Sequence, residues 1–300
     1  MKRWLIVGIS ILLIGAGVAV WSYRRTHLTN VNREDTIGLS TNGTPGSSDQ
    51  GATPTPSPAA SQPVPSFVAD TTSTKTTTGW NDDLDTLDSQ RFQASDGWTN
   101  GAPFAVGWRA DHATFAGGQL QLRLDDQSCP YGCSGQPYAS AEYRTKEFYG
   151  FGRVETRLKP AIGSGLIGGS LFTYTGPSDG TVHDEIDIEF LGRDTTKLQT
   201  NYYTNDVGGH ETLIDLGFDA AADFHTYAFT WSPTAIQWFV DDTLVHTEDG
   251  SRGALPTHPG RIIANLWAGR DVDSWLGPFT YSGSPIEVSY DRIGFSAQEP

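Results

Sequence analysis

The chain between residues 80 and 295 is made of short runs in which apolar and polar residues alternate. Successive side chains of a β-strand point to opposite faces, so this alternation predicts strands with one buried face. Clear examples are Gln119–Leu124, Gly152–Leu158 and His225–Trp231. Two further runs, Ala235–Val240 and Thr243–His246, flank a pair of aspartates and predict a hairpin.

Gly, Pro, Asn and Asp separate these runs, and almost no stretch shows sustained helical periodicity. Many short strands without intervening helices predict an all-β fold, in which two antiparallel sheets stack as a sandwich and one sheet curves into a cleft. The first third of the chain lacks this pattern, so the folded domain is expected at residues 80–300.

The first 25 residues are expected to enter a membrane as an anchor or a signal segment. Lys2 and Arg3 precede an apolar run, Trp4–Trp21, that would be about 27 Å long as a helix, close to the thickness of a bilayer core. Small residues at Gly17 and Ala19 permit cleavage, whereas the long run and the basic and aromatic residues after it favour retention. Either outcome exports the remaining chain, which is then secreted or held at the membrane facing outside.

Residues 26–79 are expected to form a disordered linker. From about Leu39 to Gly79 the chain consists mainly of Thr, Ser, Pro, Gly and Ala, which cannot bury a core. Such a linker holds the folded domain away from the cell envelope, and the alternative is an inert segment without that task.

Charge and aromatic content narrow the choice of partner. The chain has 20 Lys and Arg against 35 Asp and Glu, a formal net charge of −15, which argues against nucleic acid or an anionic membrane surface. The 9 Trp, 11 Tyr and 14 Phe can fill a β-core and still offer faces on which sugar rings stack, although all of them fit a core as well.

Cys129 and Cys133 are the only cysteines, and no second pair or histidine cluster completes a zinc site with them. The exported setting is oxidising, which favours a small loop disulfide, with two free thiols as the alternative.

The most unusual stretch is Asp184–Gly192, which reads Asp-Glu-Ile-Asp-Ile-Glu-Phe-Leu-Gly. In a strand, Glu185, Asp187 and Glu189 emerge on one face and the two isoleucines on the other. Crowded like charges destabilise a strand, so this pattern points to chemistry rather than to folding. The alternatives are a solvated edge strand and a calcium site, which is more typical of loops.

The spacing of these acids suits glycoside hydrolysis. The Cα atoms of Glu185 and Glu189 are about 13 Å apart in an extended strand. If the sheet is concave, their long side chains can approach to about 5 to 6 Å, the gap used by retaining glycosidases. One carboxylate then attacks and the other donates a proton, while Asp187 between them hydrogen-bonds one partner and crowding keeps one acid protonated.

The same stretch resembles the active-site signature of family 16 glycoside hydrolases, and its continuation to Asp219 is similar to bacterial licheninases, the endo-β-1,3-1,4-glucanases. The similarity covers nearly all of residues 80–298. Further matching pieces are Trp98–Gly101, Ala141–Arg144, Phe172–Pro177, Phe224–Phe229, Asn265–Trp267 and Asp273–Gly277.

The resemblance implies a jelly-roll (concanavalin-like) sandwich with its cleft on the concave sheet. It implies Glu185 as nucleophile, Glu189 as general acid/base and Asp187 as the residue that tunes them. No cofactor is expected for catalysis, the implied partner is a neutral β-glucan, and a monomer is expected. Licheninases share the regular Glu-x-Asp-x-Glu spacing, whereas many β-1,3-glucanases insert a residue before the last Glu, so mixed-linkage glucan is favoured.

The resemblance also implies binding positions. Glucan-binding side chains carry over to Asn100, Glu142, Arg144, Phe172, Tyr174, Asn201, Tyr203, Asn265, Trp267 and Trp275. His183, which departs from the licheninase pattern, is a further candidate for substrate binding. Each aromatic alone fits a core role, and Glu142 with Arg144 fits a simple ion pair. A possible structural calcium ion on the convex side carries over to Asp83, Gly118 and Asp291.

Two departures bear on the function. Licheninases carry Trp where this chain has His183, which instead resembles xyloglucan endotransglycosylases of the same family. His183 is then either a hydrogen-bonding neighbour of Glu185 or a passive filler. The licheninase disulfide is missing, because Val106 and Ser140 stand in place of its cysteines. Endotransglycosylation of xyloglucan or glucan is therefore the alternative activity, followed by a non-catalytic glucan-binding module.

Overall fold

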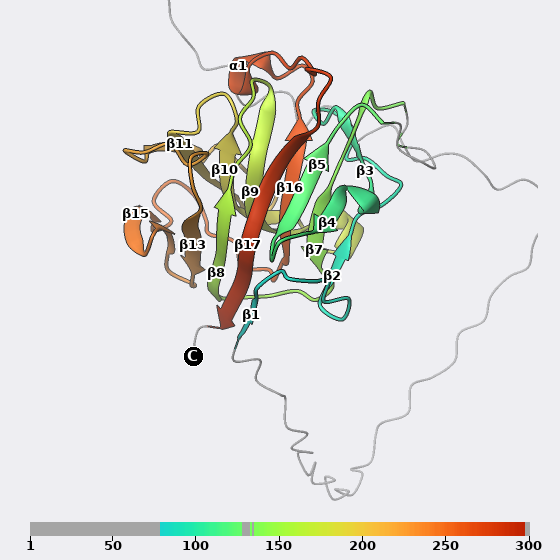
Figure 1. Cartoon of the computed structure of the whole chain (residues 1–300). Helices are drawn as coiled ribbons and strands as arrows, with labels where there is room; N and C mark the ends of the chain where they lie inside the picture. The colour runs from blue at the N-terminus through green and yellow to red at the C-terminus, as the bar shows by residue number, and fades with distance from the viewer. Residues whose placement is uncertain (1–78, 128–132, 134, 298–300) are drawn as a thin grey trace, which may run out of the picture. The chain divides into compact units, whose positions relative to one another are not determined.

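The computed structural model describes residues 79–127, 133 and 135–297 (Figure 1). Regular structure there is almost entirely β-strand, with a short helix α1 (Asp273–Leu276) and the 3-10 turns η1 (Ala110–His112) and η2 (Pro177–Asp179). The predicted membrane segment and all of the predicted linker except Gly79 lie outside the described residues. Within the described part, no helix has the length and apolar character needed to cross a membrane.

Two large antiparallel sheets form the described domain. The first sheet runs β15-β14-β13-β8-β17-β5-β4, with β1 paired to β17. Its strands are β1 (Trp80–Asp82), β4 (Ala113–Phe115), β5 (Leu120–Leu124), β8 (Gly152–Lys159), β13 (His225–Trp231), β14 (Ile236–Val240), β15 (Thr243–Glu248) and β17 (Ile286–Ala297).

The second sheet runs β12-β11-β10-β9-β16-β7-β2. Its strands are β2 (Phe92–Ala94), β7 (Glu142–Thr145), β9 (Leu166–Thr175), β10 (Asp184–Leu191), β11 (Lys197–Tyr203), β12 (Thr212–Asp215) and β16 (Arg261–Ala268). A parallel pair, β3 (Val106–Trp108) and β6 (Tyr138–Ser140), lies outside both sheets. The predicted all-β sandwich is confirmed.

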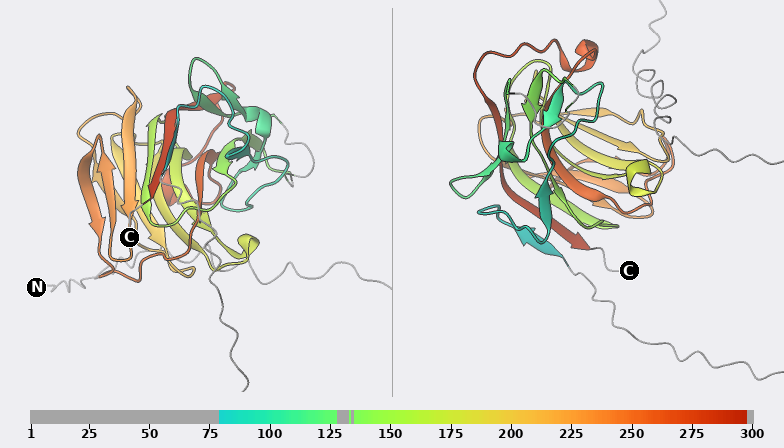
Figure 2. Two further views of the ribbon diagram at one scale, coloured as in Figure 1. Left: turned by 90° about the horizontal axis from the view of Figure 1, so that it is seen from below. Right: turned by 90° about the vertical axis from the view of Figure 1, so that its right-hand side faces the viewer.

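The two sheets stack as layers, and an apolar core fills the space between them (Figure 2). The predicted alternation decides which side chains enter this core. Its buried members include Leu120, Leu122 and Leu124 of β5, Val154 and Leu158 of β8, and Tyr227, Phe229 and Trp231 of β13. The predicted hairpin is confirmed as β14–β15, whose turn residues Asp241 and Asp242 have φ of 46° and 61°. A two-residue hairpin turn needs this left-handed conformation.

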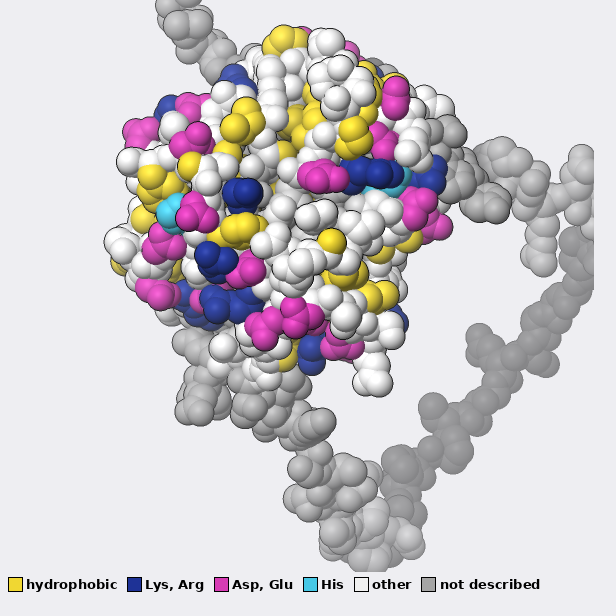
Figure 3. Space-filling model, viewed as in Figure 1, with side chains coloured by type: hydrophobic (Ala, Val, Ile, Leu, Met, Phe, Trp, Pro, Cys, Tyr) yellow, Lys and Arg dark blue, Asp and Glu magenta, His cyan; other side chains and the backbone are white. Residues whose placement is uncertain are grey.

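The solvent side of the first sheet carries both signs of charge. Arg153 and Arg292 both pair with Glu155, at 2.8 and 2.6 Å, and Arg157 pairs with Asp291 at 2.7 Å. Seen from the side of β17, Lys, Arg, Asp and Glu side chains are interspersed (Figure 3). This face is an ordinary solvated surface, and the acids of the candidate site lie on the other sheet.

The cysteine prediction is confirmed at the one cysteine that the structure describes. Cys133 is disulfide-bonded. Cys129, the chain's only other cysteine, lies outside the described residues.

Candidate active site

The predicted acidic strand is β10, inside the second sheet. It pairs with β9 on one side and β11 on the other, so it is not an edge strand. Ile186 and Ile188 are fully buried in the core, while Glu185 and Glu189 are half-buried on the opposite face. The pairing with β9 is regular from Asp184 to Glu189, and a register shift follows Glu189. The three acids therefore share the outward face of the sheet.

Strand register brings the predicted binding residues to the same face, because directly paired residues of antiparallel strands point to the same side. Three rows cross the sheet: Tyr203–Glu185–Tyr174–Arg261, Asn201–Asp187–Phe172–Ile263–Arg144, and Gln199–Glu189–Ser170–Asn265–Glu142. We call the surface made by these rows the acidic face. It contains the predicted positions Glu142, Arg144, Phe172, Tyr174, Asn201, Tyr203 and Asn265.

Glu189 has the environment of a general acid. Partial burial and the negative charge of Glu185 raise the pKa of Glu189 to about 8. Gln199 Nε2 donates a hydrogen bond to Glu189 at 2.9 Å, and Gln199 Oε1 accepts one from the indole of Trp275 at 3.0 Å. These two hydrogen bonds orient the Glu189 carboxyl and connect it to Trp275, a predicted binding residue on α1. The raised pKa favours the protonated form of Glu189 near neutral pH.

Asp187 is buried between the two glutamates, with 3% of its surface exposed. Burial raises the pKa of Asp187 well above its ordinary value, and the charges of Glu185 and Glu189 and a hydrogen bond with Glu185 act in the same direction. The backbone carbonyl of Asp187 accepts a hydrogen bond from the buried indole of Trp238 at 2.9 Å. Asp187 is thus a rigidly held acid that can donate a hydrogen bond to Glu185.

His183 precedes the acidic strand and contacts Glu185 directly. Its Nε2 lies 2.8 Å from Oε2 of Glu185, so the ring is a hydrogen-bonding neighbour of Glu185. Its ring stacks on Tyr203 with centroids 4.7 Å apart and lies 5.2 Å from the ring of Tyr174. The imidazole therefore links the acid strand to two predicted sugar-stacking residues.

The remaining predicted binding residues lie on loops, α1 and the end of β16. Asn100 accepts a hydrogen bond from the indole of Trp108 at 2.6 Å. Trp267 stacks on Phe104 at 4.1 Å and lies 5.9 Å from Trp275. This aromatic cluster joins the row of Glu189 through the Trp275 contact with Gln199.

Several residues of the site were missed by the sequence prediction. Ser95 Oγ donates to the buried carboxylate of Glu142 at 2.6 Å, and Ser170 Oγ donates to Asn265 at 2.7 Å. Gln199 was missed in the same way. Its strand neighbours Asn201 and Tyr203 were identified, and a spacing of two residues along β11 was the signal that could have added it.

The positions proposed for calcium do not gather in one group of ligating side chains. Asp291 pairs with Arg157, Asp83 accepts a hydrogen bond from Asn81 at 2.9 Å, and the carboxylate beside Gly118 belongs to Asp85. Among the described residues, no group of three or more His, Cys, Asp or Glu side chains is placed to hold a metal ion. The calcium site therefore stays a prediction.

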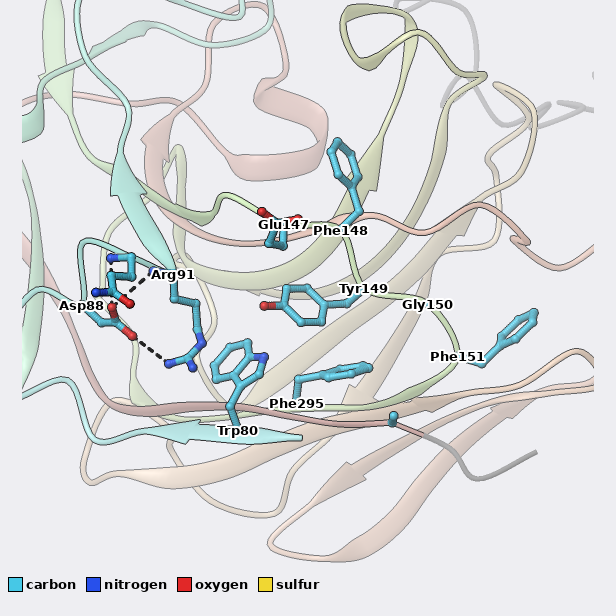
Figure 4. Close-up of a pocket in the computed structure, with 11 residues that line it drawn as sticks. Trp80, Asp88, Arg91, Glu147, Phe148, Tyr149, Gly150, Phe151 and Phe295 are labelled. Carbon is cyan, nitrogen blue, oxygen red and sulfur yellow. Dashed lines mark hydrogen bonds and ion pairs between the residues drawn. The ribbon is translucent and has the colours of Figure 1, made fainter. Parts of the chain in front are cut away.

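A cavity of about 530 Å³ lies away from the acidic face, where β1 meets the end of β17 (Figure 4). The rings of Trp80, Tyr149 and Phe295 point toward one another there, with centroid distances of 5.6 and 4.8 Å. The guanidinium of Arg91 covers the Trp80 ring at 4.7 Å. Because these aromatic faces already serve packing, we assign the chemistry to the acidic face rather than to this cavity.

Asp184 fastens two loops to the start of the acidic strand. Its buried carboxylate accepts hydrogen bonds from the backbone N–H groups of Asn205, Thr257 and His258 at 2.9 to 3.0 Å, and from the His258 imidazole at 2.8 Å. Burial acts to raise the pKa of Asp184, but these hydrogen bonds lower it below 3.8. Its stabilising effect is therefore complete above the unfolded pKa and is lost as the pH falls through the folded pKa.

Replacing Asp184 by alanine is expected to lower the free energy of unfolding by about 3 to 5 kcal/mol at pH 7, because the buried N–H groups that it accepts from lose their hydrogen-bond partner. Urea denaturation checks this value. Asp215→Ala, whose side chain is 85% exposed on β12, is the control and is expected to change it by less than about 0.5 kcal/mol. Equal losses in both variants would contradict the fastening role.

Comparisons with known proteins agree with this geometry. The model of the glycosyl hydrolases family 16 matches residues 100–283, more than half of the chain. A β-glucanase of Paenibacillus polymyxa is 47% identical over 216 residues, which cover 71% of this chain and 86% of the relative.

Solved structures give the same result. A prokaryotic β-1,3-1,4-glucanase (lichenase) derived from a mouse hindgut metagenome matches with a TM-score of 0.69 and 45% identity, covering 74% of this chain and all of that one. The β-glucanase of Bacillus licheniformis matches with a TM-score of 0.68 and 41% identity, covering 75% of this chain and all of that one. The fold is the predicted jelly roll, and the chain belongs to the family 16 glycosyl hydrolases.

Proposed function

We propose that this enzyme is a retaining endo-β-glucanase that hydrolyses mixed-linkage β-1,3-1,4-glucan. One observation carries the proposal: Glu185, Asp187 and Glu189 share one face of the second sheet, and burial together with the charge of Glu185 raises the pKa of Glu189 to about 8. The β-glucanase and lichenase relatives support the substrate class.

The two glutamates divide the work of a double displacement. Glu189 donates its proton to the glycosidic oxygen while Glu185 attacks the anomeric carbon, so the bond to the leaving sugar breaks and a glycosyl ester forms on Glu185. Glu189, now a carboxylate, takes a proton from water. The resulting hydroxide oxygen attacks the same carbon, displaces Glu185 and restores the original β configuration.

Asp187 supports both steps without touching the glycosidic bond. As a neutral acid it donates a hydrogen bond to Glu185, which orients the nucleophile and adds no second negative charge beside it. When Glu185 becomes an ester, its charge is lost, and the pKa of Glu189 falls because that charge was one cause of its elevation. This fall favours Glu189 as a base in the second step.

The regular strand supports the linkage preference that the resemblance to licheninases implies. The register between β9 and β10 is unbroken through all three acids, as the spacing predicted, and the irregularity comes only after Glu189. Tyr174, Phe172 and Tyr203 offer stacking faces in the rows of Glu185 and Asp187, and Asn201, Asn265 and Glu142 offer directional hydrogen bonds to sugar hydroxyls.

A substrate panel tests this function. Reducing-end release is expected from barley β-glucan and lichenan at rates about 100-fold or more above those from laminarin and xyloglucan. Labelled acceptor oligosaccharides added to the same reactions measure transfer. Transfer faster than hydrolysis would instead identify an endotransglycosylase, and absence of release from every polymer would identify a binding module.

We further propose that the enzyme works outside the cytoplasm as a monomer, exported by the apolar segment Trp4–Trp21 and either secreted or retained at the membrane. Sequencing the mature N-terminus separates these two outcomes. Structural calcium is proposed on the convex side, and catalysis in this family needs no cofactor.

A further inference from the structure

The imidazole of His183 lies between two carboxylates. Its Nε2 is 2.8 Å from Oε2 of Glu185, and its Nδ1 is 3.3 Å from Oδ1 of Asp206. The Nε2 contact is a hydrogen bond, and the Nδ1 contact lies within ion-pair distance. Two carboxylates around one imidazole favour its positively charged form over the neutral form.

Asp206 is held in place for this contact by a fastened turn. Thr204 and Val207 bridge the turn, and Asn205 and Asp206 have φ of 52° and 68°. The backbone N–H of Asp206 donates to the carbonyl of His183 at 3.0 Å, next to the Asn205 contact with Asp184. The turn is therefore anchored to the start of the acidic strand and presents its carboxylate to the imidazole.

The surroundings of His183 stabilise its charge. Glu185 contacts it from β10, Tyr174 from β9, Tyr203 from β11, and Asp206 from the turn. Burial acts to lower the pKa of His183, but the hydrogen bond and charge of Glu185, together with Asp206, raise it above 6.5. Glu185 therefore has a positively charged neighbour in His183 and an acidic neighbour in Asp187.

We propose that His183, held by Asp206, is a positioning residue that orients Glu185 and keeps it ionised for attack. The proposal rests on the nucleophile role of Glu185 described above. Licheninases carry tryptophan at this position, and an indole has no positive charge. His183 would therefore do in this chain what the tryptophan of licheninases cannot do. The pH below which Glu185 stops acting as a nucleophile should consequently depend on His183.

The test uses 2,4-dinitrophenyl 2-deoxy-2-fluoro-β-cellobioside, whose phenolate leaves without a proton from Glu189. The bond between Glu185 and the anomeric carbon forms as the bond to the phenolate breaks, so the labelling rate reports the nucleophile alone. In His183→Leu, labelling at pH 6 is expected to be about 10- to 100-fold slower, and the pH of half-maximal rate is expected to rise. His183→Gln, which keeps a neutral donor, is expected to show a smaller shift.

His225→Gln is the matched control, because His225 contacts Asp241 at 2.7 Å on the first sheet. It is expected to label like the wild type. A second readout is the histidine ¹⁵N NMR spectrum, in which His183 of Asp206→Asn is expected to lose its proton at a lower pH than in the wild type. This readout and His183→Gln decide the matter if His183→Leu fails to fold.

Wild-type rate and pH dependence in His183→Gln or His183→Leu would overturn the positioning role and leave the role of Glu185 intact. Failure of the wild type to label at all would instead overturn the nucleophile assignment. A neutral His183 ring at pH 6 in the NMR spectrum would also contradict the inference.

Discussion

Replacing Glu185 by glutamine is expected to slow hydrolysis of barley β-glucan by about 10⁵-fold while the protein stays folded. The amide has no charged oxygen to attack the anomeric carbon. It also removes one of three crowded carboxyl groups, so circular dichroism and cooperative unfolding are expected to persist. Reducing-end release measures the loss.

The matched control is Glu287→Gln, which changes an exposed glutamate on β17 of the first sheet and is expected to keep full activity. Added azide shows whether the lost function is that of the nucleophile. In Glu185→Ala, azide can occupy the vacated space and is expected to give a glycosyl azide of α configuration from an activated aryl glucoside. Full activity in Glu185→Gln would contradict the assignment.

Replacing Glu189 by glutamine is expected to slow hydrolysis of the glucan by about 10²- to 10⁴-fold, the usual contribution of a general acid. The effect depends on pH. Because burial and Glu185 raise the pKa of Glu189 to about 8, wild-type kcat/KM for the glucan is expected to fall as the pH rises past that value. The acid form needed for the first step is lost there.

An activated aryl glycoside separates this role from that of Glu185. Its leaving group needs no proton, so formation of the glycosyl-enzyme in Glu189→Gln is expected to stay near the wild-type rate and to lack the alkaline limb. Azide added to Glu189→Ala is expected to give a product of β configuration, opposite to that from Glu185→Ala. An unchanged alkaline limb for glucan hydrolysis by Glu189→Gln would refute the general-acid role.

Much of the fold could be predicted because strand formation is largely a local property. Alternation in Gln119–Leu124 and Gly152–Leu158 places leucine and valine in the core and charged residues outside. The hairpin turn at Asp241 follows from two residues that tolerate a left-handed backbone. Strand order was not predictable in this way, since β8 pairs with β13 and β17, which are far away in the sequence.

In the candidate site, too, local features could be predicted from the sequence and contacts between distant segments could not. The period of two residues was enough to place Glu185, Asp187 and Glu189 on one face, and the family resemblance added the binding residues on the neighbouring strands β9, β11 and β16. What sequence reasoning missed depends on contacts between distant segments, such as Ser95 with Glu142 at 2.6 Å. Asp206 was missed for the same reason, because only the folded turn brings it to His183.

The central claim is that Glu185 forms the covalent intermediate of a retaining hydrolysis. Labelling the wild type with 2,4-dinitrophenyl 2-deoxy-2-fluoro-β-cellobioside, followed by proteolysis and mass spectrometry of the peptides, tests it most directly. We predict one added glycosyl group per chain, located on Glu185. A label located on Glu189, on Asp187 or on a residue outside the acidic strand would contradict the account.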